Sequence, residues 1–326
     1  MKKSMKNLIK SLTLATCVLS LAGCSIANKT TNTNTNKIND VLKNENYNLV
    51  FSDDFDGDKL DRTKWRVGYN TPDRRAGFYE DSENTVFVKD GNLVIRTSYK
   101  KDGQYGEGWY TSWVESCTDK NKGHTQTPDN FKGFAGKYGY YEIRCKVPKT
   151  KGIWSAFWLM PNENVGMTKD DILGTGSDGV EIDVMESPWY YKMFKKNTNQ
   201  HVLHGDGYKL NKTETSPMLK VPNMYDEFHT YGVLWNEEEY IFYIDGKGTW
   251  RTKHTVDGEE LGVSQVEEYL LMTVEVAGYK DEDGNFHVGK ELIDGKEKNN
   301  WCGNPNSNNK TKSYDFVIDY VKVYQK

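Results

Sequence analysis

The chain has 326 residues, of which 13% are aromatic, and it contains 29 glycines. It is too aromatic to be intrinsically disordered and too rich in glycine to be a helical bundle, whereas its length suits one large all-β domain with additional segments. The formal net charge of −4 lacks the concentrated positive charge of nucleic-acid binders, so we expect no nucleic-acid partner.

The first 23 residues have the features of a secretory signal. Four lysines lie among the first ten residues, an apolar stretch runs from Leu12 to Leu21, and small residues follow. Residues 21–24, Leu-Ala-Gly-Cys, resemble a bacterial lipobox, which implies that Cys24 becomes the lipid-modified first residue of the mature protein. The protein would then be exported and held by lipid alone at the outer face of the bacterial cell membrane. A plain secretory signal, with Cys24 incidental, is the alternative.

Residues 24–48 are predicted to be a disordered polar tether. The run from Asn28 to Lys37 consists of Asn, Thr and Lys, and it lacks the apolar surface that would offset the entropy of ordering. Residues 49–326 show no internal repeat and no break in composition, so we expect one domain there. Its three cysteines, Cys117, Cys145 and Cys302, have no metal-ligand spacing, and we expect buried free thiols, with one disulfide as the alternative.

Short alternating runs predict a β-rich domain from Leu49 onward. Residues 93–97, 138–147 and 316–324 are rich in β-branched and aromatic residues, and Asp-Gly pairs such as Asp245-Gly246 mark hairpin turns. No segment after the signal sustains a helical period. The predicted fold class is therefore all-β, as a sandwich of antiparallel sheets.

Carboxylates gather in one predicted strand, of sequence Val-Glu-Ile-Asp-Val-Met-Glu-Ser. Period-two alternation places Glu181 and Asp183 on one face and apolar residues on the other. Strict alternation would put Met185 beside them. A one-residue bulge at Val184-Met185 would instead return Glu186 to the carboxylate face, and bulges are frequent beside active sites.

Three neighbouring carboxylates repel one another, so at least one should have a raised pKa and stay protonated near neutral pH. Retaining glycosidases need such an acid and an ionised carboxylate about 5–5.5 Å apart. On a flat strand Glu181 and Glu186 would lie roughly 13 Å apart at the backbone, so curvature and inward-leaning side chains must close the gap. The alternative is a solvated strand face without a catalytic role.

Aromatic residues flank this strand in the sequence. Trp154 and Trp158 precede it, and Trp189 follows it. Sugar rings stack on flat aromatic faces, but a tryptophan-rich strand is also typical of a core. The tryptophans therefore indicate a sugar site only in combination with the carboxylates.

Together these features resemble glycoside hydrolase family 16. Residues 181–186, Glu-Ile-Asp-Val-Met-Glu, match the bulged form E-x-D-x-x-E of the family signature, which laminarinases, agarases and carrageenases carry. Further matching segments follow in the family's order: Phe51–Gly57 with Trp65, Tyr138–Pro148, Trp154–Pro161, Phe228–Trp235, Tyr240–Gly246 and Ile318–Tyr324. The resemblance covers residues 49–326, which are thus the expected catalytic domain.

The resemblance implies a concanavalin A-like β-jelly roll, in which two antiparallel sheets form a sandwich with an open cleft across its concave face. It also implies endo-acting, retaining hydrolysis, with Glu181 as nucleophile, Glu186 as general acid/base and Asp183 between them. Trp154 and Trp158 match the tryptophans of the family's cleft strand. His204 lies where a neighbouring strand often supplies a histidine, although a purely structural histidine is the alternative.

Some positions depart from the family pattern. Trp113 stands where a small residue is common. Residues 272–279 stand where many family members have an Asn-rich stretch that contains paired glycines. Both places border the cleft in family members, so Trp113, like Trp189, is a candidate for contact with sugar. Several members hold a structural calcium, and Asp319 matches one of its ligands, although calcium normally takes 6–8 oxygens. No cofactor is expected to be required.

Three functions are consistent with these residues. The first is an endo-β-glycanase that cuts β-1,3- or mixed β-1,3/1,4-glucan. The second is the same mechanism on a β-galactoside, such as mucin or keratan-type glycans or algal galactans. Sulfated galactans would favour cationic residues in the cleft, and Arg74-Arg75 is the only conspicuous cationic pair in the sequence near a predicted loop. The third is a surface lectin without turnover, although a binding protein does not need three repelling acids. We expect a monomer whose partner is a β-linked polysaccharide or oligosaccharide.

Overall fold

The computed structural model describes residues 37–68, 72–119, 127–162, 173–188, 195–206, 210–305 and 312–326. The predicted signal, Cys24, most of the predicted tether and Trp189 lie outside the described residues. Within those ranges no helix is long and apolar enough to cross a membrane.

The larger of two main sheets, the outer sheet, has 11 strands. In spatial order they are β19 (Lys247–Thr252), β18 (Tyr240–Ile244), β17 (His229–Trp235), β10 (Gly139–Lys146), β27 (Ser313–Gln325), β6 (Asn92–Gly103), β7 (Gly106–Thr111), β4 (Gly77–Tyr79) and β3 (Asp73–Arg74), with β1 (Asn48–Asp53) on β27 and β5 (Val86–Lys89) on β6. Neighbouring strands are antiparallel except for β4 and β7, which are parallel.

The second sheet, the cleft sheet, has eight strands. Their order is β15 (Thr213–Thr215), β14 (Val202–His204), β12 (Glu181–Glu186), β11 (Ile153–Pro161), β22 (Glu268–Val276), β8 (Trp113–Glu115) and β2 (Arg66–Val67), with β9 (Ala135–Gly136) on β22. Short two-stranded pairs complete the described strands: β13 (Thr198–Asn199) with β16 (Leu219–Lys220), β20 (Thr255–Val256) with β21 (Glu259–Glu260), β23 (Gly278–Lys280) with β24 (Phe286–Val288), and β25 (Lys290–Ile293) with β26 (Lys296–Asn299). A 3₁₀ turn, Gly176–Asp178, precedes β12.

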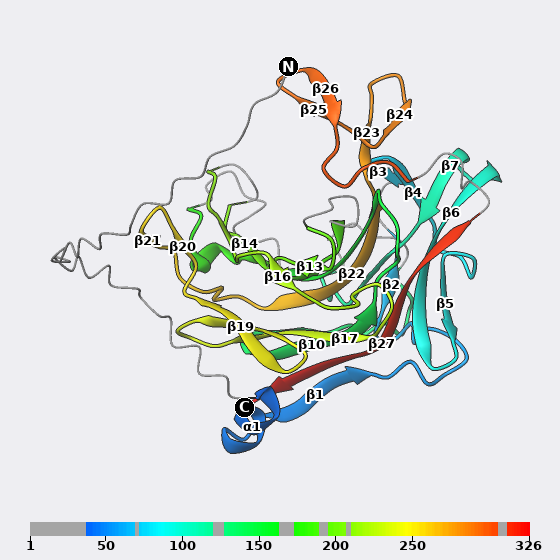
Figure 1. Cartoon of the computed structure of the whole chain (residues 1–326). Coiled ribbons are helices and arrows are strands. Elements are labelled where there is room, and N and C mark those ends of the chain that lie inside the picture. Colours follow the sequence, from blue (N-terminus) through cyan, green and yellow to red (C-terminus); the bar gives the residue numbers. More distant parts are fainter. Residues whose placement is uncertain are drawn as a thin grey trace, which may run out of the picture. The chain divides into compact units, whose positions relative to one another are not determined.

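The core lies between the two sheets because alternate residues of each strand face inward. In β11, Ile153 and Phe157 are buried in this core, whereas Trp154 and Trp158 on the opposite face are partly exposed. The outer sheet contributes residues such as Ile143 of β10. Figure 1 shows β14 and β22 in one layer above β10, β17 and β27. The predicted all-β sandwich of two sheets is confirmed.

The segment before the first strand is partly ordered. Ile38–Asn44 forms helix α1, in which Ile38 and Leu42 are buried against Tyr140 and Tyr243 of the outer sheet. The N–H of Ile38 donates to the carbonyl of Gly246 at 3.1 Å. The prediction of a disordered tether up to residue 48 is therefore wrong for this helix. Ile38 and Leu42, four positions apart, pack on the sheet together with Val41, although the surrounding composition is polar.

Two hairpins, β23–β24 and β25–β26, follow β22 and lie beyond the main sheets (Figure 1). His287 joins them, because its Nε2 lies 2.8 Å from the carboxylate of Asp281 and its Nδ1 lies 3.1 Å from that of Glu297. The ring of Tyr279 stacks on His287 with centroids 4.5 Å apart. The hairpins thus form one linked unit beside the end of β22.

The cysteines agree with the expectation of free thiols. Cys117, Cys145 and Cys302 are buried and unbridged. Burial raises the pKa of the Cys145 and Cys302 thiols well above their ordinary value, so both are inert apolar side chains at neutral pH.

Candidate active site

Strand β12 contains the predicted bulge. Where β11 pairs with β12, Phe157 lies opposite Met185 and Trp158 lies opposite Asp183, so Val184 has no counterpart. One extra residue on one strand is a β-bulge, and it shifts every later side chain to the other face.

This shift brings the acidic side chains together. Val184 and Met185, although consecutive, are both packed in the core. Glu181, Asp183 and Glu186 all line the cleft on the opposite face of the sheet. The sequence therefore predicted the position of all three carboxylates correctly.

Two side chains in and after β13 form hydrogen bonds with backbone groups of the bulge. Asn199 Oδ1 accepts a hydrogen bond from the N–H of Glu186 at 3.0 Å, and His201 Nδ1 lies 2.8 Å from the carbonyl oxygen of Val184. Burial lowers the pKa of His201 to about 3, so the ring is neutral and its Nδ1 proton is the one that bonds the carbonyl. Because a buried backbone group without a partner is costly, these contacts stabilise the bulge.

The carboxylates line a cleft of about 380 Å³ over β11, β12, β14, β15 and β22. The remaining lining residues are Arg74, Arg75, Trp154, Ala156, Trp158, Gln200, Val202, His204, Thr213, Thr215, Thr273, Glu275 and Trp301. A cleft with apolar rings and a few convergent charged groups is typical of a site that binds a small molecule or one part of a polymer.

The carboxylates have raised pKa values. Burial, followed by the charges of Glu186 and Glu181, raises the pKa of Asp183 well above its ordinary value. Burial, followed by the charge of Glu181, raises the pKa of Glu186 to about 8, although Trp154 and Arg75 oppose this shift. Glu186 is therefore mostly protonated at neutral pH, which agrees with the prediction from like-charge repulsion.

His204 lies beside these acids. On β14 it is directly opposite Glu181, its Nε2 lies 3.5 Å from the carboxylate of Asp183, and its Nδ1 lies 2.8 Å from the hydroxyl of Thr213. Burial lowers the pKa of His204 to about 4, so its ring is neutral. In the described part of the chain, Glu181, Asp183 and His204 are the group of three whose ligand atoms, within 4.8 Å of one another, could hold a metal ion.

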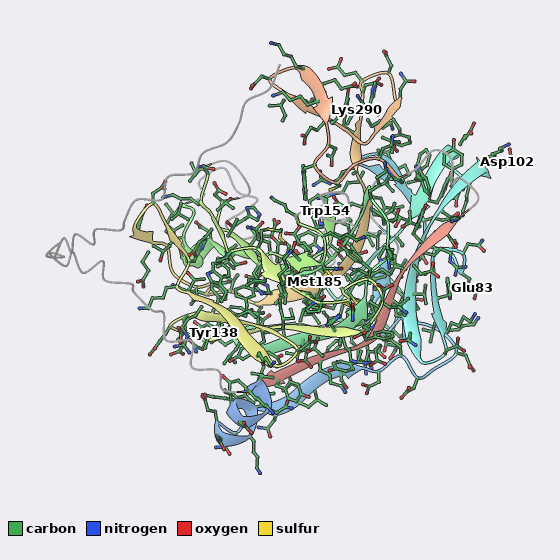
Figure 2. The ribbon with its side chains drawn as sticks, in the orientation of Figure 1. Glu83, Asp102, Tyr138, Trp154, Met185 and Lys290 are labelled. Atoms are coloured by element: carbon green, nitrogen blue, oxygen red, sulfur yellow. The ribbon has the colours of Figure 1, made fainter. Side chains whose placement is uncertain are left out.

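Tryptophans form the apolar part of the cleft. Trp154 meets Trp301 edge to face, with ring centroids 4.8 Å apart. The indole N–H of Trp158 donates to the hydroxyl of Thr273 at 3.0 Å. Figure 2 shows Trp154 between the strand that carries Met185 and the hairpin that carries Lys290. Trp154 and Trp158 thus lie where the sequence predicted, and both present rings to the cleft.

Trp113 lies on the cleft face of the sheet, opposite Thr273, but its ring is covered. It is 2% exposed, packs edge to face against Trp158 at 5.3 Å, and donates its indole N–H to Glu115 at 3.1 Å. It is not among the cleft-lining residues. The ring is covered by Trp158 and by the guanidinium of Arg74, so the structure as arranged does not support the predicted contact of Trp113 with sugar.

A family model described as "Beta-porphyranase A-D, GH16 domain" matches residues 46–326. The chain belongs to glycoside hydrolase family 16. The match begins close to the domain start predicted at residue 49 and extends to the last residue.

Named relatives of this family-16 chain differ in substrate. It is 26% identical over 303 residues to glucan endo-1,3-beta-glucosidase A1 of Niallia circulans, covering 85% of this chain but 38% of that relative. It is 30% identical over 261 residues to beta-porphyranase B of Zobellia galactanivorans, covering 74% of this chain and 78% of that relative. The catalytic domain of an endo-1,3-beta-glucanase (laminarinase) from Thermotoga petrophila shares the fold, with a TM-score of 0.60, 24% identity and coverage of 86% and 98%.

One end of this family-16 cleft carries a cluster of charges. Arg74 Nε lies 2.6 Å from Glu275 Oε1, and Arg75 Nε pairs with the other oxygen of the same carboxylate. The guanidinium of Arg75 lies over the ring of Trp154 at 4.7 Å. The two arginines therefore do line the cleft, but both are engaged by Glu275. We call Arg74, Glu275 and Arg75 the arginine clamp.

Asp319 was the candidate ligand for the structural calcium of some family-16 members. Its carboxylate is paired with the guanidinium of Arg144. Asp54 is likewise paired, with Lys322 at 2.9 Å. A calcium site needs several oxygens without a competing cation, so these residues as arranged do not fit the ion.

Sequence reasoning missed four residues of the site. Asn199 and His201, which satisfy the bulge, gave no signal, because a hydrogen bond to a bulge depends on the pairing of distant strands. Trp301 follows a hairpin more than a hundred residues after β12, so only the fold brings it to Trp154. Glu275 gave a usable signal, because it is a carboxylate in the largely apolar run Met272–Ala277, where a buried charge needs a partner.

Proposed function

We propose that the chain is an endo-acting, retaining β-glycosidase that cuts β-1,3- or mixed β-1,3/1,4-glucan. The observation that carries this proposal is the set of three carboxylates on the cleft face of a bulged strand, of which Glu186 has a pKa of about 8. A protonated and an ionised carboxyl group in one open cleft are the two groups that retaining hydrolysis needs.

In the first step Glu181 attacks the anomeric carbon while Glu186 donates its proton to the glycosidic oxygen, so that the leaving sugar departs as a neutral alcohol. The products are a glycosyl ester on Glu181 and a shortened chain. In the second step Glu186, now ionised, removes a proton from water, and the water oxygen displaces Glu181. Both carboxyl groups return to their starting states.

Asp183 and His204 act on the nucleophile. Asp183 lies between the two glutamates, and its raised pKa favours a protonated form that can donate a hydrogen bond. The neutral ring of His204 faces both Asp183 and Glu181. We infer that this pair orients Glu181 and stabilises its charge when the glycosyl ester breaks down.

Three features support a glucan substrate. Several relatives are named for action on glucan, including one in Niallia circulans. The rings of Trp154, Trp158 and Trp301 offer apolar faces for a neutral sugar chain. The cleft arginines, which would favour a charged glycan, are engaged by Glu275.

A β-galactan is the second candidate substrate. It is favoured by the description of the matching family model and by the 30% identity to a beta-porphyranase. The same carboxylates would perform the same steps, so this alternative changes the sugar in the cleft but not the mechanism.

The decisive experiment is a product profile of the purified chain from residue 25 onward. The panel contains laminarin, lichenan, agarose, porphyran, carrageenan and mucin O-glycans, and the matched control is Glu181→Gln. Oligosaccharides from laminarin or lichenan, absent with the variant, would support the glucanase. Products only from galactose-containing polymers would support the second candidate. Binding without products, unchanged in the variant, would mean a lectin and would overturn the catalytic proposal.

We also propose that the protein is exported and lipid-anchored through Cys24, on the strength of its signal and lipobox-like sequence. Expression of the full chain with labelled palmitate tests this. Label should enter the membrane fraction with the unmodified chain and not with Cys24→Ser. Export without label would indicate the plain secretory signal.

A further inference from the structure

The arginine clamp brings three charges together at one end of the cleft. The Glu275 side chain is 8% exposed, whereas those of Arg74 and Arg75 are 32% and 36% exposed. The carboxylate is therefore the inner member, and the two guanidinium groups reach the cleft. Each carboxylate oxygen is taken by a different arginine.

Aromatic contacts hold both guanidinium groups in place. Arg75 covers Trp154 at 4.7 Å, and Arg74 covers Trp113 at 5.1 Å. Trp154 is itself opposite Glu275 in the pairing of β11 with β22. The clamp is thus fixed beside the ring on which a sugar would stack.

Two arginines that converge on one point form a receptor for an oxyanion, because planar guanidinium groups bind carboxylate or sulfate through paired hydrogen bonds. In this chain the protein itself provides the anion. A sulfate or carboxylate group on a bound sugar would have to displace Glu275 and leave that carboxylate buried without a partner, which is strongly unfavourable.

We propose that Glu275 is a specificity-determining residue that occupies Arg74 and Arg75, so that the cleft accepts neutral sugars beside Trp154 and rejects sugars with an anionic group. The proposal rests on the proposed function only in assuming that the cleft binds glycan. It accounts for a cleft that contains two arginines and yet suits a neutral polymer.

The direct test removes the charge and keeps the shape of the side chain. In Glu275→Gln the amide fills the same space, and both guanidinium groups lose their ion pair with position 275. We expect the variant to bind inorganic sulfate at least about tenfold more tightly than the unmodified chain does. Binding is measured as the rise in melting temperature with millimolar sodium sulfate, against sodium chloride of equal ionic strength.

Two further variants serve as controls. Asp315→Asn frees Arg96, which is held by two hydrogen bonds of 2.7 Å on the outer sheet, and it should show little gain in sulfate binding. Glu275→Gln combined with Arg74→Gln and Arg75→Gln should lose the gain. Equal gains in Asp315→Asn and Glu275→Gln, or a gain that survives loss of both arginines, would contradict the proposal.

A second measurement uses the unmodified cleft. Tryptophan fluorescence follows the binding of laminarin oligosaccharides with and without sulfate esters to Glu181→Gln, which cannot turn them over. We expect the sulfated ligand to bind at least about tenfold more weakly, and the preference to narrow or reverse when Glu275→Gln is added. Tighter binding of the sulfated ligand than of the neutral one to Glu181→Gln alone would overturn the proposal, and this result does not require that Glu275→Gln folds.

A pH profile tests whether the charge of Glu275 acts inside the cleft. The charge of Glu275 contributes to the raised pKa of Glu186, and Arg75 opposes it. In Glu275→Gln one negative charge is lost and Arg75 is freed, so the alkaline limb of hydrolysis should move to lower pH. The sulfate assay needs no turnover, so its failure is distinguishable from failure of the proposed hydrolysis.

Discussion

The proposed hydrolysis in this cleft depends on whether the carboxyl group of Glu186 carries a proton. Glu186 is half-buried beside Glu181, and desolvation together with the charge of Glu181 raises its pKa to about 8 from an ordinary value of 4.5. The acid form therefore persists at pH values where an exposed glutamate would be ionised. A group that must donate a proton at neutral pH benefits from such an environment.

We expect kcat/KM for laminarin to fall as the pH rises through about 8, because ionised Glu186 cannot donate a proton. Glu186→Gln should reduce kcat/KM by roughly 10²-fold or more and abolish that alkaline limb. An aryl glycoside, whose leaving group needs no acid, should recover much of the loss. An alkaline limb that persists unchanged in Glu186→Gln would assign it to another group.

The pairing of Asp319 with Arg144 leads to a prediction about calcium. Because a guanidinium already neutralises this carboxylate, treatment with EDTA should leave the melting temperature unchanged, and added calcium should not raise it. Arg144→Gln, which frees Asp319, provides the comparison. A rise in melting temperature with calcium in the unmodified chain would show that our reading of Asp319 is wrong.

At the level of elements, the bulge in β12 is maintained by residues of another segment. Glu186 reaches the cleft only because Val184 is accommodated as an extra residue, and Asn199 and His201 satisfy the backbone on either side. The placement of the acid thus depends on β12 and the β13–β14 segment together.

Asn199→Ala should lower kcat by roughly tenfold with little change in KM, because the N–H of Glu186 loses its acceptor and the acid is less well positioned. The matched control is Asn236→Ala, since Asn236 Oδ1 also accepts backbone hydrogen bonds, from Glu238 and Glu239, outside the cleft. Asn236→Ala should lower stability without changing kcat. Equal effects of both variants on kcat would mean that Asn199 contributes only to stability.

These elements show what the sequence could predict. The bulge followed from local alternation, because three acids can share a face only if one residue is skipped. The partners of the bulge and the ring of Trp301 depend on which strands lie side by side, which is a property of the fold. The exposure of Trp113 could not be predicted for a related reason, since alternation shows on which face of a strand a ring lies but not which side chains cover it. Helix α1 escaped notice because its apolar contacts are two residues in a polar run.

On the scale of the whole folded unit, the cleft and α1 lie on opposite sides of the sandwich. α1 packs on the outward face of the outer sheet through Ile38 and Leu42, whereas the carboxylates line the far face of the cleft sheet. The core between the two sheets separates them. The first described helix therefore lies away from the carboxylates.

Leu42→Ala should destabilise the protein by about 2 kcal/mol, because it removes apolar contacts with the outer sheet. The melting temperature should fall by a few degrees while kcat and KM stay unchanged, since the cleft is on the other side of the core. Leu292→Ala is the control, because Leu292 is 55% exposed and its loss should change neither quantity. A fall in kcat with Leu42→Ala would reveal coupling between α1 and the cleft.

The position of α1 also determines how the molecule would bear mechanical load. If a polymer held in the cleft were pulled against the N-terminal end of the chain, the force would enter through α1 and pass to β1, which pairs with β27 of the outer sheet. Strand β12 has its partners in the other sheet. Under tension α1 would detach from the outer sheet first, and the chain before β1 would lengthen before any strain reached the carboxylates.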